Sequence, residues 1–281
     1  MQLGPVGRVD PSVDYANLPV TTEDITVPTR HGDVAARVHR PADAVPSAPV
    51  YVNFHGGGYV FRHPEQDDPL CRYLAVHAGV VVVNVDYDVA PQVRFPVPVE
   101  EAYDAVVWAA DPARPWDGTR LCVGGQSAGG GLAAAVARLA LEQGGPAIAL
   151  QVLHYPPLDL VTPGDQKHAA GRSIISVPMT QIFDTVYVPR AADRRDRLAS
   201  PAWGSNAEGI EGIAPALVIT CELDRLHDEG VRYAEALEAA GALREHVDLA
   251  GQDHGYNGLR ADVVVVDRAY AVIAGWVREA V

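Results

Sequence analysis

Short apolar runs alternate along the chain with longer segments of helical periodicity. The apolar runs predict buried parallel strands at residues 49–54, 78–86, 120–125, 147–155 and 215–221. An alternating stretch, residues 244–249, predicts one more strand. Apolar spacing near 3.6 residues predicts helices at residues 99–110, 132–141, 230–240 and 263–277. Strands that alternate with helices indicate the α/β class with a mostly parallel sheet.

Two regions interrupt this alternation. Residues 1–28 are proline-rich and weakly patterned, which predicts an arm packed on the body of the protein. Residues 160–198 carry apolar side chains among many charges, and a long insertion after a strand often forms a cap or a binding element. Extra helices packed on the body would have the same composition. Because the sequence shows neither an internal repeat nor a low-complexity linker, we expect one domain, residues 1–281.

Composition and charge restrict the classes of partner. The 281 residues are 48% hydrophobic and 21% charged, as in globular proteins, and carry a formal net charge of −14. That charge disfavours nucleic acid as a partner, because phosphate binding requires clustered lysine and arginine. The longest apolar stretches are too short to span a bilayer, and the N-terminus lacks the pattern of a secretory signal. We therefore expect a cytoplasmic protein.

Cysteine and histidine patterns give little support to metal or disulfide chemistry. Cys71, Cys122 and Cys221 are scattered, which predicts buried free thiols rather than a disulfide framework. The sequence contains no H-E-x-x-H or C-x-x-C pattern. We expect no metal and no other cofactor.

The strongest chemical motif is G-x-S-x-G at residues 125–129, between a predicted strand and a predicted helix. In that context the sharp turn exposes the serine hydroxyl, and small residues let the strand and helix approach closely. A glycine-rich turn with an incidental serine is the alternative. The flanking strand and helix favour Ser127 as a nucleophile.

A second motif, His55-Gly56-Gly57-Gly58-Tyr59, follows the first strong strand. Successive glycines free the backbone to direct N–H groups at one point, as acyl transfer requires for a developing oxyanion. A flexible turn would have the same composition. The position upstream of the serine motif favours the oxyanion loop.

An acid and a base follow two later strands. Asp224 comes after residues 215–221, and His254 comes after residues 244–249, so the chain order is serine, aspartate, histidine. Asp228 and Glu229 are expected to open the next helix, where carboxylates suit the helix dipole. Asp253 is the remaining rival, but it is adjacent to the histidine that it would have to orient.

Together these motifs resemble the bacterial hormone-sensitive-lipase-like esterases of the α/β-hydrolase superfamily. The resemblance extends from about residue 48 onwards and includes the motifs above, together with Tyr155-Pro-Pro-Leu-Asp and the run from Asp224 to Glu229. It implies an eight-stranded sheet with a small helical cap from residues 1–28 and 160–198. It also implies an oxyanion hole at Gly57, Gly58 and Ala128, with His55 supporting the loop.

Three positions depart from the family pattern. Gln126 precedes the serine where an acidic residue is usual, and Asp88 and Gln92 replace an arginine and a glutamate. The N-terminal segment is also shorter than usual, which affects the cap. None of these departures removes Ser127, Asp224 or His254.

The resemblance implies a serine carboxylesterase that forms an acyl-enzyme on Ser127. Six apolar side chains predict a pocket for an uncharged short- to medium-chain ester: Tyr59, Phe61, Ile174, Ile182, Phe183 and Tyr187. An amidase or carbamate hydrolase would use the same residues. A non-catalytic receptor is the third alternative, since plant gibberellin receptors resemble the family but have lost the histidine. Dimers are common in the family, so a homodimer is also considered.

Overall fold

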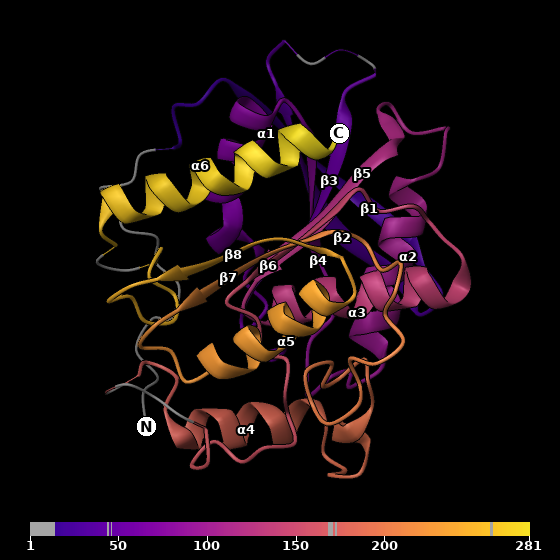
Figure 1. The fold of residues 1–281 in the computed structure, drawn as a ribbon. Helices are drawn as coiled ribbons and strands as arrows, with labels where there is room; N and C mark the ends of the chain where they lie inside the picture. Colours follow the sequence, from indigo (N-terminus) through magenta and orange to yellow (C-terminus); the bar gives the residue numbers. More distant parts are fainter. Residues whose placement is uncertain (1–14, 44, 46, 168–170, 172, 259–260) are drawn as a thin grey trace.

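One twisted sheet passes through the centre of the molecule, with helices on both faces (Figure 1). The computed structural model describes residues 15–43, 45, 47–167, 171, 173–258 and 261–281. Within these residues the strands of the sheet are β1 (Val20–Thr29), β2 (Gly32–Pro41), β3 (Pro49–Phe54), β4 (Val81–Asp86), β5 (Asp117–Gln126), β6 (Leu150–His154), β7 (Ala216–Cys221) and β8 (Leu243–Leu249).

The sheet is mostly parallel, as the sequence predicts. Its spatial order is β1-β2-β4-β3-β5-β6-β7-β8, and only the pairs β1–β2 and β2–β4 are antiparallel among the described strands. The six strands expected from the sequence are β3 to β8. β4 begins later than predicted, because Ala78 ends a helix that Gly79 caps with a φ of 70°.

Helices form a layer on each face of the sheet. α1 (Asp68–Ala78) and α6 (Val263–Ala280) pack together on one face, while α2 (Val97–Ala109), α3 (Ala128–Gln143) and α5 (His227–Ala239) cover the other (Figure 1). Successive side chains of a strand point to opposite faces of the sheet, so the strands contribute to the core on each face. Val50 and Val52 join the core under α2 and α3, whereas Tyr51 joins the core under α1 and α6. Burial of both faces explains the near-continuous apolar runs in the sequence.

The N-terminal segment differs from the expectation of a cap element. Residues 20–28 belong to β1 at the edge of the sheet. Before them, Tyr15 donates a hydrogen bond to Asp267 and its ring packs against Tyr73 and Tyr270 in the α1–α6 layer. Thr, Val and Ile are favourable strand residues, and pairing with β2 satisfies their backbone groups. The described part of residues 1–28 therefore extends the body; residues 1–14 lie outside the described residues.

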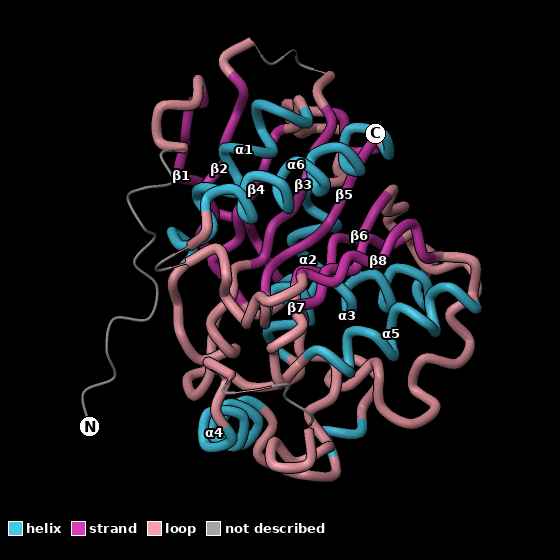
Figure 2. The backbone as a smooth tube through the Cα atoms, turned by 60° about the vertical axis from the view of Figure 1, so that its left-hand side comes forward, coloured by secondary structure: helices cyan, strands magenta, loops and turns pink. Residues whose placement is uncertain are grey.

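The segment between β6 and β7, residues 155–215, is a long insertion. It contains α4 (Val177–Tyr187) and a 3₁₀ turn, η2 (Asp193–Arg195). A second 3₁₀ turn, η1 (Pro64–Asp67), precedes α1. Figures 1 and 2 both show α4 at the margin of the molecule, outside the helical layers. The insertion follows the carboxyl end of β6, and ligands of parallel α/β sheets bind at that edge.

Candidate active site

Ser127 occupies a strained turn between β5 and α3. Its φ of 52° and ψ of −124° are unusual for a residue with a side chain, and such strain is common at functional sites. The two flanking glycines permit the turn. A Cβ at Gly129 would lie 1.7 Å from the carbonyl oxygen of Phe54, and one at Gly125 would lie 2.2 Å from the same atom. The close approach of strand and helix expected from the motif is therefore present.

Ser127, His254 and Asp224 form a continuous hydrogen-bonded chain. His254 Nε2 lies 2.8 Å from Ser127 Oγ, and His254 Nδ1 lies 2.7 Å from Asp224 Oδ2. A carboxylate only accepts hydrogen bonds, so Nδ1 carries the proton and Nε2 is free to accept the serine proton. Asp224 and His254 are both buried, and the second oxygen of Asp224 accepts a bond from the backbone N–H of Leu226.

The rival carboxylates have other partners. Asp228 lies beside His227, and Glu229 pairs with Lys167 at 2.6 Å, both from the first turn of α5. Asp253 accepts hydrogen bonds from Ser173 Oγ and the backbone N–H of Ile174 in the insertion. The geometry thus favours Asp224 as the partner of the histidine.

The glycine loop follows β3 and needs the conformational freedom of glycine. Gly57 has a φ of 127° and Gly58 a φ of 61°. A Cβ at Gly57 would lie 2.4 Å from the carbonyl oxygen of Phe61, and one at Gly58 would lie 2.8 Å from the ring of Phe183 on α4. Across the site, Ala128 is the first residue of α3, where backbone N–H groups lack helical partners.

His55 supports this loop from beneath. Its Nδ1 donates a hydrogen bond of 2.7 Å to the carbonyl oxygen of Gly56, and its ring stacks on Tyr87 at 4.3 Å. The Tyr87 hydroxyl donates in turn to the carbonyl oxygen of His55. Burial lowers the pKa of His55 to about 4, so the ring is neutral at neutral pH.

Gln126, which departs from the family pattern, connects three parts of the site. Its Nε2 donates to Asp67 Oδ1 at 2.5 Å, and its Oε1 accepts hydrogen bonds from the Tyr155 hydroxyl and from Asn257 Nδ2. Asp67 is fully buried and also accepts from the backbone of Gly56 and from Asn53. Burial raises the pKa of Asp67 to about 7, although these donors oppose the shift. The family pattern has an acidic residue at position 126, and here Asp67 of η1 places a carboxylate beside that position instead.

Two pockets meet at Ser127. The large pocket, about 310 Å³, is lined by the glycine loop, by Ile174, Met179 and Phe183 of the insertion, and by His254. The small pocket, about 40 Å³, is lined by Tyr59, Leu160, Lys167, Thr180 and Asp184 among others. Gly58, Ile175 and Phe183 border both pockets.

The predicted pocket residues divide into two groups. Tyr59 lines the small pocket, Phe61 and Ile174 line the large pocket, and Phe183 lines both. Ile182 lines neither of these pockets, because it lies on the outer face of α4, where it is 56% exposed. Tyr187 is buried behind Tyr59, with the two rings stacked at 4.0 Å, so it supports the pocket wall instead of forming it.

Several site residues were not predicted. Tyr155 packs its ring against His254 at 4.8 Å, and Lys167 and Asp184 bring charge into the small pocket. Arg225, beside Asp224, donates to the carbonyl oxygens of Gly164, Lys167 and Ile175 in the insertion. The sequence did carry a signal for these contacts, a charged residue next to the acid and another next to the base. Arg225 follows Asp224, Asp253 precedes His254, and both bond to the insertion.

Two features are absent from the part of the chain that the structure describes. There, no three His, Cys, Asp or Glu side chains gather as metal ligands. In the same part of the chain, no helix combines the length and apolar character needed to cross a bilayer.

A serine on a strained strand-to-helix turn, bonded through histidine to aspartate at the carboxyl edge of this sheet, defines the class of α/β hydrolases. A model of the α/β hydrolase fold family matches residues 51–258, and this chain belongs to that family. The predicted likeness to the hormone-sensitive-lipase-like esterases is confirmed by the named relatives that follow.

The chain is similar to several ester hydrolases. It is 35% identical to the carboxylic ester hydrolase LipN of Mycobacterium tuberculosis, over 85% of this chain and 65% of that protein. It is 35% identical to the ethyl acetate hydrolase of Pseudomonas putida, over 92% and 82% of the two chains. The structure of a hyperthermophilic esterase from Pyrobaculum calidifontis superposes with a TM-score of 0.87 at 36% identity, over 95% of this chain and 86% of the other.

Proposed function

We propose that this protein is a serine carboxylic ester hydrolase. The observation that carries the proposal is the hydrogen-bonded chain from Ser127 through His254 to Asp224, at the edge of the sheet where the two pockets meet. The esterase names of relatives that match most of the chain support the same activity.

The geometry suits nucleophilic catalysis through an acyl-enzyme. His254 Nε2 takes the proton of Ser127 as Oγ attacks the ester carbonyl, and Asp224 stabilises the imidazolium that forms. The tetrahedral intermediate collapses, and the alcohol leaves with the proton from His254. Water, activated by the same histidine, then attacks the acyl-enzyme and releases the acid.

The oxyanion is held by the backbone N–H groups of Gly57, Gly58 and Ala128 in this mechanism. The positive φ angles of both glycines and the position of Ala128 at a helix N-terminus support the assignment. Buried, neutral His55 keeps the glycine loop in this conformation through its bond to Gly56.

The pockets support uncharged esters of short to medium chain length. The large pocket adjoins His254, which must reach the leaving oxygen, so it receives the alcohol part. The small pocket does not include His254 and receives the acyl part. With about 40 Å³ available, the acyl part is the one restricted in length.

The test is hydrolysis of p-nitrophenyl acetate, butyrate, hexanoate and laurate by the wild type and by Ser127→Ala. We expect the highest kcat/KM on the shorter chains and a loss of at least about 10⁴-fold in kcat for the variant. Ser205→Ala, at an exposed serine, is the matched control and should keep full activity. Activity that survives in Ser127→Ala would contradict the assignment of the nucleophile, and a strong preference for long triglycerides would contradict the substrate range.

A further inference from the structure

Charged side chains line part of the small pocket, whereas the sequence predicted an apolar pocket. Lys167, Asp184 and Thr180 line it together with Tyr59 and Leu160. An alkyl chain inside it would meet an ammonium group and a carboxyl group. Burying such groups against methyl groups is unfavourable unless their hydrogen bonds are satisfied.

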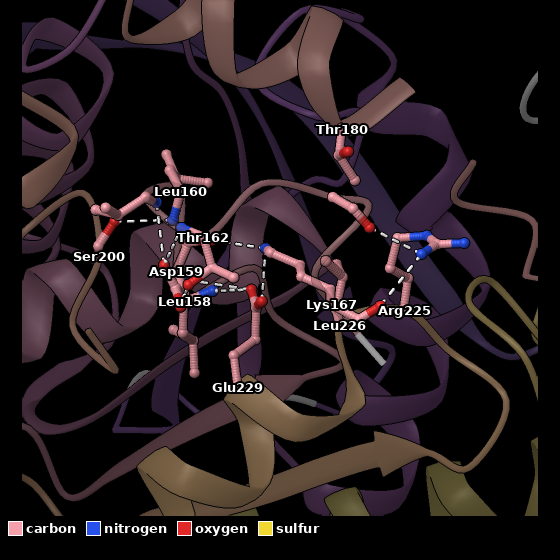
Figure 3. Close-up of polar contacts among 12 residues, drawn as sticks. Leu158, Asp159, Leu160, Thr162, Lys167, Thr180, Ser200, Arg225, Leu226 and Glu229 are labelled. Atoms are coloured by element: carbon pink, nitrogen blue, oxygen red, sulfur yellow. Dashed lines mark hydrogen bonds and ion pairs between the residues drawn. The ribbon is translucent and has the colours of Figure 1, made fainter. Parts of the chain in front are cut away.

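Lys167 is held rigidly with one donor unused by the described residues. Its buried Nζ donates to Glu229 Oε2 and to the carbonyl oxygen of Asp159, each at 2.6 Å (Figure 3). An ammonium group has three donors, so these contacts take two. Burial lowers the pKa of Lys167, but the neighbouring carboxylates of Glu229, Asp184 and Asp159 raise it more, and the group stays charged.

Both carboxylate oxygens of Glu229 are occupied by donors in this arrangement. Its Oε1 accepts the backbone N–H groups of Leu158 and Asp159, while Oε2 accepts Lys167 (Figure 3). Arg225 fixes the same segment from the other side, through the carbonyl oxygens of Gly164 and Lys167 (Figure 3). The position of the ammonium group is therefore determined by the fold.

Asp184 faces the same pocket from α4. It is buried, and its carboxyl accepts no hydrogen bond from the described residues. Burial raises its pKa to about 7, which Lys167 partly opposes. One turn earlier, Thr180 Oγ1 donates to the carbonyl oxygen of Val177. The pocket thus presents a donor on Lys167 and a carboxyl on Asp184.

The charges favour a neutral guest. The positive charge of Lys167 is matched by Glu229, and Asp184 adds negative charge as it ionises, so an anionic acyl group would be repelled. A hydroxyl group both donates and accepts, which matches the two groups at once. The small pocket, about 40 Å³, has room for roughly three groups of the size of a water molecule.

We propose that the preferred substrates are esters of short hydroxy acids, whose hydroxyl group lies between Lys167 and Asp184 in the small pocket. The proposal rests on the esterase function proposed above and specifies its acyl group. It excludes simple alkanoates as the best substrates, because their terminal methyl group would leave the third donor of Lys167 and the carboxyl of Asp184 without a partner.

The test compares ethyl 3-hydroxypropanoate with ethyl butanoate, which differ by a hydroxyl in place of a methyl group. We measure kcat/KM for each by titration of the released acid, and the readout is their ratio in wild type and variants. The wild type should favour the hydroxy ester at least about tenfold, the contribution of one hydrogen bond to a charged group. In Asp184→Leu, which is close in shape, the ratio should fall at least tenfold. Comparing ratios cancels any difference in the intrinsic reactivity of the esters.

Two further variants sharpen the result. Lys167→Met/Glu229→Gln removes the donor without leaving an unpaired buried charge, and it should lower the ratio as well; it also serves if Asp184→Leu fails to fold. Asp193→Leu, at a carboxylate that pairs with Arg190 on the surface of the insertion, should keep the wild-type ratio.

The outcomes separate this proposal from the proposed function. Equal ratios in wild type and pocket variants, or a wild-type preference for butanoate, would overturn the hydroxy-acid proposal while leaving the esterase intact. An equal fall in Asp193→Leu would also overturn it. A folded wild type that hydrolyses neither these esters nor p-nitrophenyl acetate would instead overturn the esterase function itself.

Discussion

At the scale of single residues, Gln126 shows how a carboxylate can be supplied from elsewhere in the chain. Gln126 stands where the related esterases usually have an acidic residue, and Asp67 places its carboxylate 2.5 Å from the glutamine amide. Through Tyr155 and Asn257 the same amide group reaches the loop of His254. We therefore expect Gln126 to act as a positioning residue for the glycine loop, the nucleophile and the base.

A charge exchange tests this role. Gln126→Glu places a second carboxylate beside Asp67, whose pKa is already raised to about 7, so the two groups repel each other once both are ionised. We expect kcat on p-nitrophenyl butyrate to fall about tenfold relative to wild type at pH 8 and to recover in part at pH 6, where the pair shares a proton.

The double variant Asp67→Asn/Gln126→Glu should restore most of kcat at pH 8, because it exchanges the carboxylate and the amide. Gln92→Glu, at an exposed position that also departs from the family pattern, is the control. Unchanged activity of Gln126→Glu at both pH values would refute the positioning role. A sequence pattern predicts Ser127, Asp224 and His254 because each lies in a local motif, whereas the link between Asp67 and Gln126 joins positions 59 residues apart.

At the scale of elements, the insertion is fastened to the loops that carry the acid and the base. Asp253 accepts hydrogen bonds from Ser173 and Ile174, and Arg225 donates to the carbonyl oxygens of residues 164, 167 and 175. The position of the insertion therefore depends on the residues next to His254 and Asp224. Ile174 lines the large pocket. Loss of these bonds should therefore affect binding of the alcohol part first.

Asp253→Ala should raise KM for 2-naphthyl acetate by up to about 30-fold, because it removes two hydrogen bonds to the insertion, together about 2 kcal/mol. KM for ethyl acetate, with its small alcohol, should change less. Asp228→Ala removes another carboxylate near the acid, one that bonds to its neighbour His227, and is the matched control. An equal rise in KM for both esters would show that the insertion does not shape the large pocket.

Elements differed in how well their sequences revealed them. Strands buried on both faces have continuous apolar runs, and these were predicted. β1 lies at the edge of the sheet, and apart from Ile25 and Val27 it consists largely of threonine and charged residues, so its strand pattern was weak. On α4 the inward face comprises Thr180, Phe183, Asp184 and Tyr187, at helical spacing. Ile182 lies off that face, and a helical-wheel argument based on Phe183 would have excluded it.

At the scale of the whole molecule, buried histidines make folding sensitive to acid. His39 on β2 is fully buried, and its Nε2 lies 3.5 Å from Asp68 Oδ1. Burial, with Arg72 and Arg37 nearby, lowers its pKa to about 4 from an ordinary 6.5. The unfolded chain therefore binds a proton below pH 6.5 that the folded chain does not bind until about pH 4, so stability is lost as the pH falls through this window.

His39→Leu should remove this loss. Relative to wild type, the free energy of unfolding of the variant should rise by about 2.5 kcal/mol between pH 7.5 and pH 4.5, from the pKa of about 4. Urea unfolding at the two pH values measures the difference. His77→Leu, at an exposed histidine, is the control. If the gap between His39→Leu and wild type is the same at both pH values, His39 does not contribute to the acid sensitivity.

The burial of the three cysteines has a practical consequence. Cys71, Cys122 and Cys221 are free thiols inside the core under α1 and α6, and burial raises the pKa of each. Thiolates are the reactive form, so these side chains resist maleimide reagents in the folded protein. Ile182→Cys would then supply the one thiol that such a reagent modifies. A fluorophore attached there would show whether α4 moves during turnover, without removal of any native cysteine.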